Sequence, residues 1–431
     1  MNGARGSARE LKHQVLVMLA AAMTAVLARW WGGYPNCPTD ELNWAHIAQQ
    51  LDQGVDWPVS GPLYLAVLRA LGGSLRHDYP RTLALMGVLF VPLAMLALIW
   101  RYRRLGVSPL RMTLLALCLS SYFWAALIES RPQQWGQVLV LVGGTSLWLA
   151  LSGRGPWLVY AATLVLTAFT HILSYALLVM LSLWLMGYFF LLRNISLGTL
   201  ARCALALALS AGVFLLPGGP YGAMLNDIAH NHLQGNGWRM AGLAGLGATA
   251  FVILLLQRHH LRDVVLPWFE HRLRRARARP LLFGLGTLAV VGATLSAQAA
   301  ILPADAWRPY GGSVLRFALS QSGNLAFAAL VVAGWIDTVT RADAPPALRA
   351  FTVMGLGWAC IGALLLAASA FLLDTNWLLR VLNYAILFGA PLAAVPLAAL
   401  LRSRPAAWLL VTAIGGVSFM LAVRHLAVYS C

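Results

Sequence analysis

Two adjacent carboxylates, Asp40 and Glu41, stand in the segment TDELNW at residues 39–44 of a chain that holds only 14 acidic residues among 431. Pro38 precedes the segment and Thr39 is a suitable N-cap, so the pair is expected in the first turn of a helix. A carboxylate on a rigid element at a membrane surface can serve as a general base. Acids in a first turn also complement the helix dipole without any catalytic role, and both interpretations remain open.

Further ionisable side chains stand at the predicted ends of apolar segments. Glu129 and Arg131 belong to ESRPQQW, where a local ion pair between them is one explanation of both. Arg380 lies in LLDTNWLLRVLNY, and its guanidinium can bind phosphate oxygens or extend to lipid headgroups. His171, in FTHILSY, is costly at membrane depth. It is either a helix-packing group or a ligand contact.

The composition indicates the elements that must position these groups. Hydrophobic residues make up 60% of the chain and charged residues 10%, whereas soluble domains carry roughly 25% charge. Long apolar runs recur, and a bilayer core about 30 Å thick needs about 20 apolar residues per helix. Because backbone groups in lipid need internal hydrogen-bond partners, the chain is predicted to be an all-α polytopic membrane protein.

About thirteen transmembrane helices are expected. The predicted spans cover approximately residues 13–31, 80–100, 108–128, 133–151, 156–170, 172–192, 199–216, 240–257, 281–299, 324–340, 350–373, 382–402 and 406–423. The hairpin at 156–192 is the least regular of these, because almost no loop separates its two helices. We expect a single transmembrane domain over residues 1–431, with no separate soluble domain.

The arginines predict the orientation. With a cytoplasmic N-terminus, the basic runs at 101–104 and 258–280 fall in inside loops, as do the arginines at 341–349 and 402–404. The net charge of +17 is therefore explained by lipid headgroups, and nucleic acid is not an expected partner because stacking aromatics are not interleaved. Lys12 is the single lysine, which together with Ala, Leu, Arg and Gly richness suggests a high-GC bacterium and its inner membrane.

The first outside loop, at residues 32–79, is predicted to contain two amphipathic surface helices. In TDELNWAHIAQQL, Leu42, Ala45, Ala48 and Leu51 follow one helical stripe. A second amphipathic segment covers residues 62–71, after a break rich in proline. Most acids fall on this outer side, so any chemistry is expected there.

These motifs resemble the GT-C family of glycosyltransferases that use polyprenyl-phosphate sugars, which includes protein O-mannosyltransferases and lipid A aminoarabinose transferases. TDELNWAHIAQQL is similar to that family's first-loop motif, DWPVSGPLYLAVLRAL to the stretch that follows it, and ESRPQQWGQVLVL at 129–141 to the boundary at the second outside loop. The motif similarity covers the first third of the chain. The resemblance implies a multi-helix fold and transfer of a sugar from a polyprenyl-phosphate donor to a glycan, lipid or protein acceptor.

The resemblance also implies roles. In an inverting displacement, Asp40 would be the general base and Glu41 would orient it or bind the acceptor. Arg131, Arg380 and His171 would contact the donor phosphate. Glu129 would contact substrate, or share Mg²⁺ or Mn²⁺ with Asp40 as a second-loop acid does in some relatives.

Aromatic side chains complete the predicted site. Trp44 and Tyr310 could stack on a sugar ring, although interfacial belts of Trp and Tyr produce the same pattern without a ligand. The sequence holds no P-loop and no dinucleotide-binding glycine motif, which argues against a nucleotide-sugar donor. The alternative function is a transporter or flippase of a lipid-linked sugar, which would favour mid-span charges and internal repeats.

Overall fold

The computed structural model describes residues 15–30, 40–55, 61–192, 195–215, 256–277, 321–372 and 376–428, apart from 18 and 25, with single residues at 245, 249, 253, 286 and 289. Within these ranges only the backbone is described at 40, 213–215, 258, 266, 269, 273, 276–277, 366–372, 376–380 and 424–428. The predicted spans at 240–257 and 281–299 and the loops around them therefore lie outside the residues that can be compared. The same holds for Tyr310.

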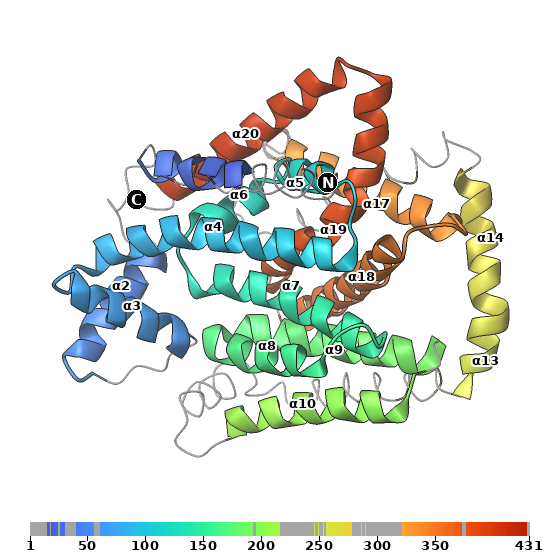
Figure 1. Ribbon diagram of the computed structural model, residues 1–431, viewed down its shortest axis with the longest axis horizontal. Coiled ribbons are helices and arrows are strands. Elements are labelled where there is room, and N and C mark those ends of the chain that lie inside the picture. Colours follow the sequence, from blue (N-terminus) through green and yellow to red (C-terminus); the bar gives the residue numbers. More distant parts are fainter. Residues whose placement is uncertain are drawn as a thin grey trace, which may run out of the picture.

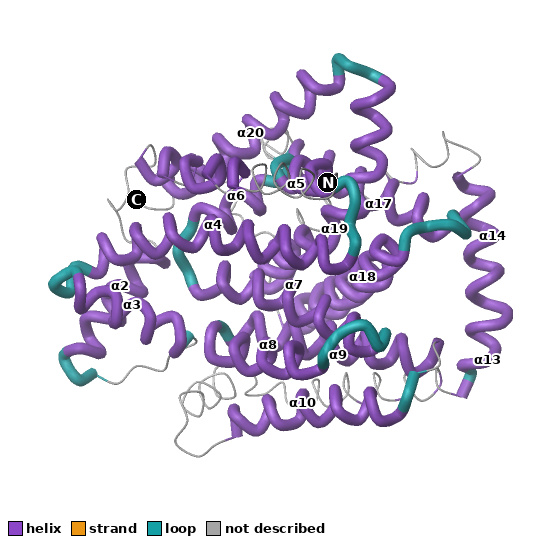
Figure 2. Tube along the Cα trace, viewed as in Figure 1, coloured by secondary structure: helices purple, strands orange, loops and turns teal. Residues whose placement is uncertain are grey.

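The described chain is all-α, as predicted, and forms no strand within those ranges (Figure 2). Within the described ranges, six helices are long and apolar enough to cross a membrane: α4 (Tyr79–Leu105), α7 (Pro132–Leu151), α9 (Ile172–Leu192), α17 (Ser322–Thr340), α18 (Pro346–Leu372) and α19 (Asn376–Ser403). Shorter apolar helices are Val15–Trp30, α8 (Trp157–Thr170), α10 (Leu197–Leu215) and α20 (Ala407–Val428). Every predicted span within the described ranges coincides with helix, but the count of thirteen is not established.

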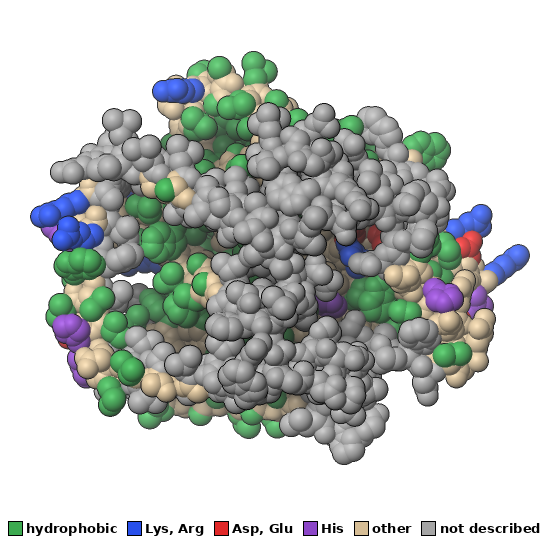
Figure 3. All heavy atoms as spheres, turned by 180° about the vertical axis from the view of Figure 1, so that it is seen from behind, with side chains coloured by type: hydrophobic (Ala, Val, Ile, Leu, Met, Phe, Trp, Pro, Cys, Tyr) green, Lys and Arg blue, Asp and Glu red, His purple; other side chains and the backbone are tan. Residues whose placement is uncertain are grey.

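The spans run back and forth between two ends of the molecule (Figure 1). At one end lie α2 (Asp40–Asp52) and α3 (Pro62–Ser74) of the first loop, on the left of the view. The end of α4 and the α17–α18 turn, which carry arginines of the predicted inside loops, lie toward the other end, and the α19–α20 turn lies at the top of the view. Seen from behind, Lys or Arg side chains are visible at both sides and also at the top, with patches of hydrophobic side chains between them (Figure 3).

The two helices of the first loop are those expected from the amphipathic pattern. Ala45 and Ala48 of α2 are buried against Tyr64 and Leu68 of α3 and against the start of α4. Pro62 occupies the first turn of α3, where its missing N–H is not needed. This small core attaches the loop to the bundle and gives its polar residues fixed positions.

The third predicted span is not one straight helix. Residues 108–128 form α5 (Leu110–Leu117) and α6 (Ser121–Ile128), which meet at a bend of 88°. Polar side chains satisfy the interrupted backbone: Asn324 Oδ1 accepts from the Ser121 N–H at 3.1 Å, and Ser418 donates to the Leu119 carbonyl at 2.7 Å. Irregular backbone at membrane depth needs such internal partners. Apolarity alone predicts a continuous span here because it does not register these contacts.

The basic run at 101–104 is also not a loop. Helix α4 continues through it and ends at Leu105, and the next residue, Gly106, has a φ of 85° that gives a left-handed C-terminal turn. Arg101 is buried, and its Nε donates to Thr145 Oγ1 at 2.8 Å while a terminal nitrogen donates to Ser146 Oγ at 2.7 Å. Because these hydrogen bonds to α7 satisfy the buried guanidinium of Arg101, helix α4 can continue through this charged residue.

Helix α7 forms the centre of the bundle, and most of its residues are buried. It packs against α4, α8, α9 and α19. Gly143 and Gly144 face Leu178, Leu181 and Phe388 so closely that an added Cβ would lie 2.8 Å from the nearest leucine methyl in each case. Small residues permit this close approach of helices, which stabilises association where lipid offers no hydrophobic driving force.

Candidate functional site

A short extended segment, Glu129–Ser130–Arg131, connects α6 to α7 at the α2–α3 end of the bundle. Glu129 has ψ of 142° and Arg131 has ψ of 155°. Pro132, the first residue of α7, disfavours helical backbone at the residue before it and so keeps Arg131 extended. The segment thus exposes its backbone N–H and C=O groups to neighbouring elements.

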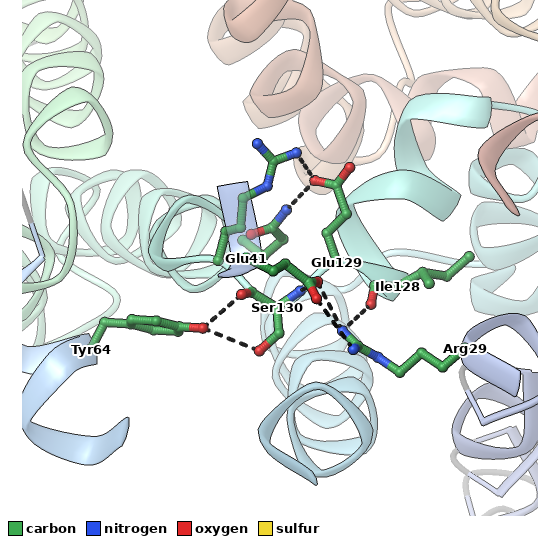
Figure 4. Close-up of polar contacts among 8 residues, drawn as sticks. Arg29, Glu41, Tyr64, Ile128, Glu129 and Ser130 are labelled. Carbon is green, nitrogen blue, oxygen red and sulfur yellow. Dashed lines mark hydrogen bonds and ion pairs between the residues drawn. The ribbon is translucent and has the colours of Figure 1, made fainter. Parts of the chain in front are cut away.

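A buried ion pair joins this segment to the first loop (Figure 4). One terminal nitrogen of Arg29 lies 3.1 Å from Glu41 Oε1 and also donates to the Ile128 carbonyl at 2.6 Å. Glu41 Oε1 accepts a further hydrogen bond from the Ser130 N–H. The side chains are 7% and 4% exposed. Because a buried carboxylate needs both charge and hydrogen-bond partners, this geometry makes Glu41 an anchor for the first turn of α2.

Tyr64 of α3 anchors the segment from a second direction. Its hydroxyl donates to the Ser130 carbonyl at 2.6 Å and lies 3.2 Å from Ser130 Oγ (Figure 4). Burial raises the pKa of Tyr64, and the nearby Glu41 charge acts in the same direction, so the phenol stays a neutral donor. Both helices of the first loop are therefore hydrogen-bonded to the same residue, Ser130, between α6 and α7.

Glu129 and Arg131 form the local ion pair that the sequence left open. Glu129 Oε2 accepts from Arg131 and from Gln134 Nε2, the latter at 2.9 Å (Figure 4). Glu129 is 5% exposed, whereas the Arg131 side chain is 24% exposed. Arg131 can consequently contact a ligand while Glu129 holds it in place.

Trp44 lies beside this cluster. Its ring meets Tyr64 edge-on at 5.6 Å, and Tyr64 meets Trp135 at 5.3 Å. Trp135 in turn stacks on Phe90 at 5.7 Å. Trp44 is only partly buried, so this aromatic row supports Tyr64 and leaves part of the Trp44 surface accessible.

His171 lies at the α8–α9 corner, adjoining the start of α7. The Ser174 N–H donates to His171 Nδ1 at 3.3 Å, and Ser174 Oγ lies 3.0 Å from the same nitrogen. Ser174 Oγ is also 2.7 Å from the Tyr384 hydroxyl of α19. Because Nδ1 accepts, the neutral ring carries its proton on Nε2.

Gly61 shows how tightly the elements meet here. A Cβ at this position would lie 2.8 Å from the Thr170 carbonyl oxygen and 3.1 Å from Pro132 Cβ. The start of α3, the start of α7 and the α8–α9 corner are therefore in contact. Glu41, Glu129, Arg131, Trp44 and His171 belong to one contiguous layer at this end.

The remaining predicted site residues are placed in part. Asp40 is the first residue of α2, directly before Glu41, and Arg380 lies in the first turns of α19, but only their backbones are described. Sequence reasoning missed Arg29, Ser130 and Tyr64. A signal for Arg29 existed, since an arginine inside an apolar run must have a partner or a function.

The described side chains favour an arginine-paired carboxylate over a metal ligand at Glu129. Glu129 Oε2 contacts the Arg131 guanidinium, and a cation beside a carboxylate disfavours the approach of a second cation. Among side chains whose positions are described, no three His, Cys, Asp or Glu residues gather as metal ligands.

Comparison with known proteins adds little. No protein-family model and no curated protein matches this sequence. The crystal structure of ArnT from Cupriavidus metallidurans bound to undecaprenyl phosphate is similar over 91% of this chain and 78% of that chain, with 15% identity and a TM-score of 0.36. A similarity of this size is too low to carry an argument.

Proposed function

We propose that the protein is a GT-C-type glycosyltransferase that moves a sugar from a polyprenyl-phosphate donor to an acceptor hydroxyl on a glycan, lipid or protein. The observation that carries the proposal is the contact between Glu41 of the first-loop acid pair and Ser130 of the α6–α7 segment. Two motifs 89 residues apart, each similar to a GT-C motif, are brought together in one buried layer.

Asp40 is proposed as the general base. Its neighbour Glu41 is held by Arg29 and Ser130, which positions the first turn of α2 and hence the Asp40 backbone. Of the two roles left open for Glu41, orientation fits better than acceptor binding, because its carboxylate is already engaged and buried. Asp40 would take the acceptor proton as the acceptor oxygen bonds to the anomeric carbon.

Arg131 is proposed to stabilise the leaving group. As the bond from the anomeric carbon to the phosphate oxygen breaks, the electron pair stays on polyprenyl phosphate, and a guanidinium binds the resulting oxyanions well. Glu129 and Gln134 orient Arg131. Arg380 and His171 are proposed as further phosphate contacts, and Trp44 and Tyr310 as sugar contacts. Mg²⁺ or Mn²⁺ remains a proposal from the resemblance alone, and no step runs through a metal.

The site is proposed to face the periplasm from a bacterial inner membrane, with a cytoplasmic N-terminus. The arginine-bearing end of α4 and helix α14 lie opposite the α2–α3 end (Figure 1), and Arg-rich loops tend to stay inside. A polyprenyl-phosphate donor would then meet the acceptor at the outer membrane surface.

The test is sugar transfer from a panel of radiolabelled polyprenyl-phosphate sugars in membranes holding wild type, Asp40→Asn or Asn43→Ala. Asn43 is exposed on the same helix and serves as the matched control. We expect transfer by wild type and Asn43→Ala, and a loss of about 10²-fold or more in folded Asp40→Asn. Full activity of Asp40→Asn would remove Asp40 as the base. Uptake or flipping of the donor without any transfer would favour the transporter alternative.

A further inference from the structure

A basic amphipathic segment lies across the end of the bundle opposite the candidate site. It comprises α13 (Arg258–His260), η1 (Leu261–Val265) and α14 (Leu266–Arg277), on the right of Figure 1. Helix α14 contacts α17 and runs crosswise to α4, α7 and α9. Because the long apolar helices cross the bilayer, a helix lying across their ends follows the plane of the membrane surface.

The side chains of α14 divide into two faces. Trp268, His271, Arg272 and Arg275 follow helical spacings of three and four residues and are all exposed. We call these four residues the basic face. Glu270 falls on the other side, is partly buried, and pairs with Arg274 at 2.5 Å. The acid of α14 is thus kept off the basic face.

Charge and exposed apolar surface occur together on this segment. Residues 258–277 hold six arginines and two acids, a net charge of +4 with His neutral. Trp268 is 56% exposed and Val264 is 52% exposed. The Arg272 guanidinium lies 5.3 Å from the centre of the Trp268 ring. Arginines beside a tryptophan at the end of membrane helices are the pattern of a helix that binds the headgroup region.

We propose that the basic face of α14 is a binding surface for anionic phospholipid headgroups of the leaflet opposite the candidate site. Trp268 enters the headgroup layer, and Arg272 and Arg275 contact lipid phosphates. A lipid surface is favoured over an acidic protein because the helix lies at the level of the helix ends, where phospholipid is always present. The proposal is independent of glycosyl transfer.

The experiment uses the full chain in nanodiscs. The five native cysteines are replaced, His271→Cys is labelled with an environment-sensitive fluorophore, and quenching by acrylamide and by a spin label on the lipid headgroup is measured. Discs contain phosphatidylcholine alone or with about 30 mol% phosphatidylglycerol. We expect anionic discs to reduce acrylamide quenching about threefold or more and to increase lipid-borne quenching, since one arginine near an anionic surface changes binding about fivefold.

Two charge-reversal variants distinguish an effect of the basic face from an effect of the protein's net charge. Arg272→Glu with Arg275→Glu should abolish the difference between the discs, whereas Arg402→Glu with Arg404→Glu, an equal change in the exposed α19–α20 turn, should preserve it. Should the first variant not fold, raising salt from about 0.05 to about 0.5 M should reverse the protection in wild type. The proposal would be overturned by equal quenching in both discs or by equal effects of the two variants. It would also be overturned if protection appeared only with an added acidic protein.

Discussion

Arg29 and Glu41 show how a charged pair can be structural within a candidate catalytic layer. Both side chains are almost fully buried, and together they occupy the Ile128 carbonyl and the Ser130 N–H. Such a pair adds little net stability relative to apolar residues, but removing one partner leaves a buried charge uncompensated. It fixes the position of α2 relative to α7.

Arg29→Met should therefore lower the free energy of unfolding by about 3–5 kcal/mol. The double variant Arg29→Met with Glu41→Leu should recover a substantial part of that loss, because no unpaired charge remains. Denaturation in mixed micelles measures both. The matched control is Arg69→Met, whose ion pair with Asp52 is 44% exposed at the arginine and should be worth about 1 kcal/mol or less. A double variant no better than the single would contradict this account.

Asp52 at the end of α2 connects the two surface helices to the start of α4. Its carboxylate accepts from the Tyr79 hydroxyl, from Arg69 Nε at 2.8 Å, and faces His77 Nδ1 at 2.9 Å. The Tyr79 hydrogen bond, supported by Arg69 and His77 and opposed by burial, holds the pKa of Asp52 below its ordinary value of 3.8.

A lowered pKa in the folded state stabilises the fold above the unfolded pKa, and this contribution is lost as pH falls through the folded value. The thermal midpoint of wild type should therefore exceed that of Asp52→Asn at neutral pH, and the difference should shrink below about pH 4. Scans from pH 7 to pH 3 measure it. Asp343→Asn, at an exposed carboxylate, should follow wild type throughout. A difference independent of pH would show that Asp52 acts only by packing.

Three elements meet at Gly61, and their fit depends on a missing side chain. The carbonyl of Thr170 and the ring of Pro132 are rigid neighbours, so a methyl group there has no flexible atom to displace. Gly73, in the last turn of α3, has no heavy atom within 4 Å of an added Cβ. Adding a methyl group should therefore change the stability in opposite directions at these two glycines.

Gly61→Ala should destabilise the protein by about 1–3 kcal/mol, because it separates α3 from α7 and the α8–α9 corner. Gly73→Ala should stabilise it by about 0.5–1 kcal/mol through helix propensity. Thermal unfolding and sugar transfer, measured together, test both. If Gly61→Ala were as stable and active as Gly73→Ala, the close contact of these elements would not matter to the site.

At the scale of the whole molecule, the two ends differ in chemistry. One carries α2, α3 and the candidate site, and the other carries α14 and the arginine-bearing end of α4 (Figure 1). The bundle between them buries polar contacts such as Tyr102 with the Leu387 carbonyl at 2.5 Å. A membrane protein of this kind must present each end to a different compartment.

Cysteine labelling in intact cells tests that arrangement. Gly73→Cys should react with a membrane-impermeant maleimide in intact spheroplasts, whereas Arg404→Cys should react only after permeabilisation. Both positions are exposed, so accessibility in the permeabilised sample is the internal control. The reverse pattern would place the candidate site in the cytoplasm and exclude the proposed donor orientation.

The apolar helices of the described chain and the two amphipathic helices of the first loop could be predicted from the sequence alone. These follow from local periodicity and composition, because lipid compels an apolar run to form a helix. The buried stripe of Ala45 and Ala48 was predictable for the same reason.

Other features depend on which distant residues the fold brings together. The bend between α5 and α6 depends on Asn324 and Ser418, about 200 and 300 residues away along the chain. The pairing of Arg29 with Glu41 and the burial of Arg101 against α7 likewise depend on which helices pack together. A hydropathy pattern records the preference of each residue for lipid or water. It does not record which distant residue forms a hydrogen bond or ion pair with a given buried polar group. Those pairings position the residues of the candidate site.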